Sequence, residues 1–76
     1  MIHYKEPTIS ELLSKCMVTW NLGSERIALT AEASPPTCEQ IFCKEGERYK
    51  VIAVFGPYSC RWADVLLVSM EAEPCA

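Results

Sequence analysis

The sequence lacks any long hydrophobic run. No apolar stretch in its 76 residues approaches the roughly 18 that a membrane-spanning helix needs. The first seven residues also lack the apolar centre of a secretory signal. We therefore expect a soluble, cytoplasmic protein that makes no contact with a membrane and is not exported by a signal of its own.

Residues that carry common catalytic and cofactor chemistry are scarce as well. The chain has one histidine, His3, and three glycines, which lie too far apart for a glycine-rich phosphate loop. The carboxylates are scattered, and no two of them stand in an apolar setting that would suit one to be an acid and the other a base. A Cys60–His3 pair would lack a third group to orient the base. We therefore expect a protein that is not an enzyme and binds no cofactor.

The net charge is small and negative. Ten acidic and seven basic residues give −3, whereas binding to nucleic acid requires a surplus of Lys and Arg. The one candidate nucleic-acid patch consists of Lys44, Arg48, Tyr49 and Lys50, and a small barrel that binds nucleic acid is our second functional hypothesis. A solvated strand face accounts for the same charges with fewer assumptions, so nucleic acid is not the partner we expect.

Cysteine is abundant, but its pattern is not that of a strong metal site. The five cysteines cannot all pair within one chain, and without a signal peptide we expect reduced thiols that mostly fill the core. Cys38 and Cys43 have a spacing at the loose end of the zinc-ligand range, and Cys60, Cys75 or His3 could complete the set. Because no second close pair exists, a zinc-stabilised module is only our third hypothesis, and we expect no metal.

What the sequence does contain is regular apolar spacing. Over residues 9–20 the apolar side chains recur as they do on one face of a helix. Thr8 and Glu11 have the spacing of a capping box at the start of this run, and Gly23 is a typical stop after it. The pattern predicts a helix over residues 9–20.

Four further segments have the composition or the period of a β-strand. Alternation predicts the first strand, although Ser24 and the alanines that follow also suit a helix. Two β-prone runs around Gly46 predict a hairpin, with a one-turn helix capped by Thr37 and Gln40 as the alternative at its start. The predicted strands span 26–32, 40–44, 48–55 and 64–71.

Together these elements predict one α+β domain over residues 1–76. An N-terminal helix packs on a three- to four-stranded antiparallel sheet, and residues 1–7 and 72–76 form mobile ends. The alternative is an SH3-like small barrel over residues 38–71 with an N-terminal helix.

The central strands have an excess of apolar side chains. Alternation places Val51, Ala53 and Phe55 on one side of a strand and Ile52 and Val54 on the other, although a sheet with one solvated face would alternate cleanly. One helix covers only one face, and each large side chain left in water forgoes about 1.5–3 kcal/mol. We expect the second face to be covered by a partner protein or by a second copy in a homodimer, with closure by the chain itself as the alternative.

The segment GPYSCRWAD, residues 56–64, is predicted to be a loop, yet it contains Tyr58, Arg61 and Trp62. These residue types are over-represented among those that dominate binding energy, so the three are the candidate partner-binding residues. A large aromatic residue at the end of a sheet is also commonly packed as a lid on the core. The sequence therefore allows Trp62 either to face a partner or to pack on the core.

The leading functional hypothesis is a small non-enzymatic protein-interaction module. Such a module acts as an inhibitor, adaptor or regulator by occupying a surface of a larger macromolecule. Chains of this size and type are frequent in phages and mobile elements, so an origin of that kind is part of the hypothesis.

Overall fold

The protein is built almost entirely from β-strands. The computed structural model describes residues 1–58 and 61–70, with only the backbone of Tyr58. Strands account for 60% of it and helix for 9%, so the predicted α+β fold is wrong. The elements are β1 (Ile2–His3), α1 (Ile9–Ser14), β2 (Cys16–Leu22), β3 (Glu25–Glu32), β4 (Ile41–Lys44), β5 (Glu47–Tyr58) and β6 (Trp62–Ser69).

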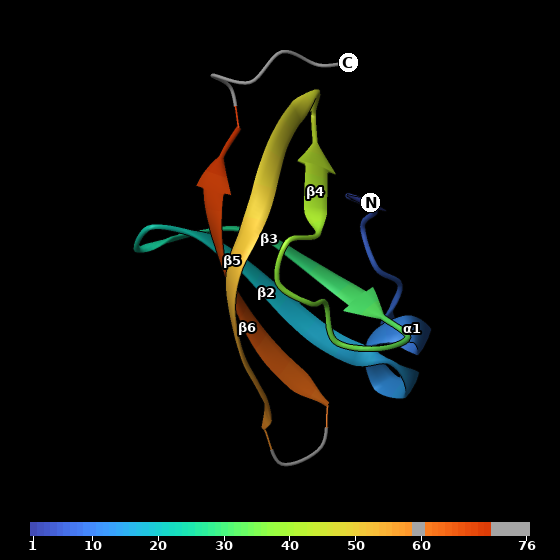
Figure 1. Cartoon of the computed structure of the whole chain (residues 1–76). Helices are drawn as coiled ribbons and strands as arrows, with labels where there is room; N and C mark the ends of the chain where they lie inside the picture. The colour runs from blue at the N-terminus through green and yellow to red at the C-terminus, as the bar shows by residue number, and fades with distance from the viewer. Residues whose placement is uncertain (59–60, 71–76) are drawn as a thin grey trace.

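The strands form one curled sheet, a mixed half-barrel, in the order β1-β4-β5-β6-β2-β3 (Figure 1). β1 pairs with β4 and β2 pairs with β6 in parallel, and the other neighbours are antiparallel. The predicted sheet was an antiparallel meander and contained neither parallel pair. The alternative, an SH3-like barrel with an N-terminal helix, is wrong because the long helix is not present.

The predicted helix over residues 9–20 begins where expected and ends early. The Glu11 amide donates to the Thr8 hydroxyl at 3.1 Å, and the Thr8 amide donates to the Glu11 carboxylate at 3.0 Å, which confirms the capping box. α1 then ends at Ser14 after six residues, none of them buried. Within residues 1–58 and 61–70, no helix has the length and apolar character needed to cross a membrane.

The second half of the predicted helix is strand β2, which pairs with β3 and β6. Cys16, Val18 and Trp20 point into the core, and the side chains of Val18 and Trp20 are 0% exposed. A helical period uses Cys16, Met17 and Trp20, whereas a strand period uses Cys16, Val18 and Trp20, so the apolar residues of this segment support both interpretations. β-Branched and aromatic residues favour the extended form, and burial in the tertiary structure overrides a weak helix preference.

The other predicted strands are confirmed in position. β3 contains the strand predicted over 26–32, and β6 covers most of 64–71. The predicted hairpin is β4 and β5, and its turn residues Glu45 and Gly46 have φ angles of 51° and 80°. Positive φ at both turn positions gives the twist that a tight antiparallel hairpin needs.

The predictions about the chain ends have separate outcomes. Ile2 and His3 pair with β4, so this part of the segment 1–7 belongs to the sheet, and its mobility stays a prediction. The segment 72–76 lies outside the described residues. The single domain over residues 1–76 also stays a prediction.

An aromatic stack closes the half-barrel. Trp20 of β2 and Phe42 of β4 are separated in the sheet by β5 and β6, and in a flat sheet the three steps of about 4.8 Å would place them about 14 Å apart. Their ring centroids lie 4.1 Å apart with 8° between the planes, and both residues are 0% exposed. The Trp20 indole N–H donates to the buried Thr30 hydroxyl at 2.8 Å, so its polar edge is satisfied.

A β-bulge in β5 reverses the faces on which the side chains after it lie. Val51 and Ala53 pair with successive residues of β6, so Ile52 is an extra residue in the ladder. Side chains alternate, so this insertion moves Ala53 and Phe55 to the face away from the core, which we call the outer face, and returns Val54 to the core. The prediction that Ala53 and Phe55 share a face with Val51 is therefore wrong.

The aromatic stack gives a test of the fold. Phe42→Ala should lower the free energy of unfolding by about 3–5 kcal/mol, because it removes a buried ring and leaves a cavity. The matched control is Phe55→Ala on the outer face, where we expect a loss of about 1 kcal/mol or less. Urea unfolding followed by tryptophan fluorescence measures both. Equal losses at the two positions would contradict the assignment of inner and outer faces, and Phe42→Leu serves if Phe42→Ala does not fold.

The capping box gives a pH dependence. The hydrogen bond from the Thr8 backbone N–H, followed by smaller effects of the nearby lysines, holds the pKa of Glu11 below its ordinary value of 4.5. A lowered folded-state pKa contributes stability above the unfolded pKa, and this contribution disappears as the pH falls through the folded pKa. An NMR titration of the Glu11 carboxyl should show a lower midpoint in the folded protein than in urea. A folded midpoint at or above the value in urea would contradict the capping box.

Candidate interaction surface

The outer face of β5 and β6 exposes large apolar side chains. Ile52 is 49% exposed, Phe55 51%, Trp62 42% and Val68 43%. Phe55, Trp62 and Val68 are each adjacent in their strand to a residue that packs in the core, whereas Ile52 is the extra residue at the bulge. We call these four residues the outer patch. From Trp62 to Val68 an extended strand covers about 20 Å, so the patch forms an apolar strip along the hairpin.

A hydrogen-bonded polar cluster lies on the same face. The Thr19 hydroxyl donates to the Asp64 carboxylate, and the Asn21 amide donates to Asp64 at 3.4 Å and to the Val65 carbonyl at 3.1 Å. Thr19 is 7% exposed, and its hydroxyl is satisfied inside the protein. The cluster joins β2 to β6, which are parallel neighbours, and fixes the orientation of the carboxylate beside Phe55, the register partner of Asp64.

This arrangement has the composition of a protein-binding surface. Interfaces combine an apolar centre with polar groups that are already held in place. Phe55, Asp64 and Leu66 also line a shallow hollow of about 320 Å³ with Asn21 and Gly23. A side chain of a partner could enter this hollow and meet both the aromatic ring and the carboxylate.

The predicted partner-binding residues lie at the far end of the same hairpin. β5 continues through Gly56 to Tyr58, so most of the predicted loop 56–64 is strand. The backbones of Tyr58 and Trp62 are register partners. Trp62 belongs to the outer patch and is not among the core residues, whereas Cys60 and Cys75 lie outside the described residues.

Arg61 makes a hydrogen bond to the last turn of α1, so its side chain has a contact within the protein. Its Nη1 donates to the Leu13 carbonyl of α1 at 2.5 Å, and its own carbonyl accepts from the Met17 amide at 2.7 Å. The last carbonyls of a helix have no partner within the helix, so a cation there stabilises the helix end. The partner-binding roles of Tyr58, Arg61 and Trp62 stay predictions.

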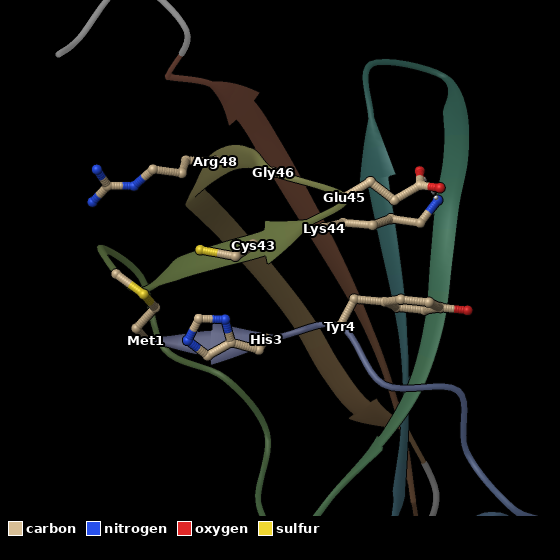
Figure 2. Close-up of a pocket in the computed structure, with 8 residues that line it drawn as sticks. All are labelled: Met1, His3, Tyr4, Cys43, Lys44, Glu45, Gly46 and Arg48. Carbon is tan, nitrogen blue, oxygen red and sulfur yellow. Dashed lines mark ion pairs between the residues drawn. The ribbon is translucent and has the colours of Figure 1, made fainter. Parts of the chain in front are cut away.

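The structure divides the candidate nucleic-acid patch. Tyr49 packs inward, with its ring centroid 6.4 Å from that of Phe42. Lys44 and Lys50 each lie beside a glutamate, at 3.7 Å and 2.9 Å. Lys44 and Arg48 lie on opposite sides of β4 (Figure 2). These residues therefore do not form one continuous basic surface.

The candidate zinc ligands are also separated. The Cys38 Sγ lies 3.8 Å from the Ile52 carbonyl oxygen, whereas Cys43 is the register partner of Arg48. Four residues of an extended strand, from Arg48 to Ile52, span about 13 Å, so the two thiols do not share a metal with bonds of about 2.3 Å. Cys43 instead has His3 as its neighbour on β1. Across residues 1–58 and 61–70, no three His, Cys, Asp or Glu side chains form a group that could hold a metal.

The sequence identifies part of the outer patch and none of the polar cluster. Ile52 is predicted on the second apolar face and Trp62 among the partner-binding residues, whereas Phe55 is predicted on the side of Val51. Thr19 and Asn21 lie in or beside the predicted helix, so the sequence gives no signal for their contacts with Asp64. No protein-family model, curated protein or solved structure matches the chain.

The contact between Arg61 and α1 can be tested by amide hydrogen exchange. Arg61→Ala should increase the exchange rate of the helix amides of Leu12 and Lys15 about fivefold, because it removes a charge-assisted hydrogen bond worth about 1 kcal/mol at an exposed site. Arg26→Ala, which removes another exposed arginine, is the matched control and should leave these rates unchanged. Unchanged helix exchange in Arg61→Ala would contradict the structural role and leave partner binding as the use of this side chain.

Proposed function

We propose that this protein is a small non-enzymatic interaction module that binds a larger protein through the outer patch and so acts as an inhibitor, adaptor or regulator. The observation that carries the proposal is the position of the exposed strip. The inner face of the sheet is filled by the chain's own side chains, and Ile52, Phe55, Trp62 and Val68 remain 42–51% exposed.

The energetic cost of this exposure supports the proposal. Complete burial of one such side chain contributes about 1.5–3 kcal/mol, so covering the exposed half of four of them contributes about 3–6 kcal/mol. The whole stability of a small domain is about 5–15 kcal/mol. An apolar strip of this size reduces solubility in the free protein, and a partner that covers it recovers this free energy.

The chemistry of the surface favours a protein partner with a basic, partly apolar surface. Asp64 keeps oxygen lone pairs that can accept hydrogen bonds from a partner while Thr19 and Asn21 hold its carboxylate in place. The net charge of −3 favours approach of a basic surface. Nucleic acid lacks apolar side chains to cover the strip and is repelled by this charge.

A charge introduced into the outer patch tests the proposal. Immobilised wild-type protein, Phe55→Glu and Ile9→Glu are exposed to a lysate of the cells that encode the protein, and retained proteins are quantified by mass spectrometry. Ile9 is the matched control because it is 78% exposed on α1, outside the patch. The partner should be retained by the wild type and by Ile9→Glu and lost with Phe55→Glu.

The retained protein is then purified and its affinity is measured directly. A central interface residue contributes about 2 kcal/mol or more, so Phe55→Glu should weaken binding at least about 30-fold. The melting temperatures of both variants should stay close to that of the wild type. Retention that does not depend on Phe55 would refute the proposal. Sedimentation of the wild type over a concentration series detects the other occupant, a second copy, which Phe55→Glu would then keep monomeric.

A further inference from the structure

A separate hollow lies at the edge of the sheet formed by β1 and β4. Its volume is about 500 Å³, and Met1, His3 and Cys43 are among the residues that line it. Figure 2 shows the Met1, His3 and Cys43 side chains together on one side of β4, whereas Tyr4, Lys44 and Glu45 lie on the other side. The outer patch and the proposed function do not use these three residues.

The strand register explains why these side chains gather. β1 runs parallel to β4, and His3 is the register partner of Cys43. Met1 precedes His3 by two residues, so its side chain lies on the same side of the extended chain. The Tyr4 amide donates to the Cys43 carbonyl at 2.7 Å and holds the end of β1 in this position. The group is therefore set by backbone pairing as well as by side-chain conformation.

The three side chains together favour a soft metal ion. A thiolate, an imidazole and a thioether are soft or intermediate ligands, and a combination of Cys and Met sulfur favours Cu(I) over harder ions. Zinc sites use Cys, His, Asp and Glu, usually four of them, and in the described part of the chain no group of three such residues exists. The methionine sulfur supplies the third donor, and a thioether ligand favours Cu(I) over zinc.

We infer that Met1, His3 and Cys43 form a binding site for one Cu(I) ion. Cys43 is a free, half-buried thiol and His3 is exposed, so the ion can enter from solvent. On binding, the Cys43 sulfur forms a bond to copper and releases its proton to water, while the imidazole nitrogen and the thioether sulfur each donate a lone pair. No electron is transferred, and copper stays Cu(I). Arg48, the register partner of Cys43 on β5, lies on the same side of β4 and also lines the hollow (Figure 2).

The site is tested by anaerobic titration with Cu(I) in competition with a coloured Cu(I) chelator. Wild type should bind one ion at this site, and Cys43→Ser should weaken its binding by at least about a hundredfold, because the loss of a direct ligand exceeds the roughly 10–100-fold effect of a supporting residue. Cys38→Ser is the matched control. Cys38 is also a free thiol, lies beside Ile52, and its replacement should leave the affinity unchanged.

X-ray absorption of the copper-loaded protein identifies the ligands. The wild type and Cys38→Ser should show two sulfur neighbours and one nitrogen neighbour, and Cys43→Ser should lose one sulfur. His3→Gln changes an exposed residue and does not threaten the fold. It should lose the nitrogen neighbour and, because His3 is a direct ligand like Cys43, bind at least about a hundredfold more weakly. Copper that binds equally well to Cys43→Ser and wild type, or a His3→Gln variant with unchanged affinity and spectrum, would overturn the site.

Discussion

The stack of Trp20 on Phe42 is the contact on which the rest of the structure depends. It joins two strands that are three steps apart in the sheet, and it holds them only if the sheet curls. The indole N–H of Trp20 also donates to the buried Thr30 hydroxyl. This stack places β4 across the core, so side chains of the same chain fill the interior. The apolar side chains that the interior does not hold remain on the outer face.

The bulge at Ile52 decides which side chains those are. A regular β5 would place Phe55 inside with Val51, and the extra residue instead places it outside, opposite Asp64. The hydrogen bonds of Asp64 to Thr19 and Asn21 then hold β6 against β2 from the outer side. The extra residue in β5 thus divides its apolar side chains between the core and the outer face. The outer face also contains the Asp64 carboxylate, whose orientation is fixed.

Local features were predictable from the sequence and long-range ones were not. The capping box of Thr8 and Glu11 and the turn at Gly46 depend on residues within a few positions of each other, and both are present. The change from α1 to β2 depends on the burial of Val18 and Trp20 by strands far along the chain, and residues 16–20 match a strand period as well as the end of the helical one. The parallel pairs β1–β4 and β2–β6 have no signature in a single sequence. The same holds for the polar cluster and for the group of Met1, His3 and Cys43, which exist only through those pairings.

The short strand β1 connects the proposed copper site to the stability of the sheet edge. β1 contains two residues, so its hold on β4 depends on few hydrogen bonds, and short edge strands protect a sheet from pairing with other chains. An ion bound by both His3 and Cys43 would join β1 to β4 directly. A ligand that binds only the paired form stabilises that form by mass action, so copper would shift β1 toward its place at the edge. Loss of β1 from the sheet would expose the edge of β4. Because Phe42 of β4 forms the aromatic stack, changes at this edge and changes in the core are coupled through β4.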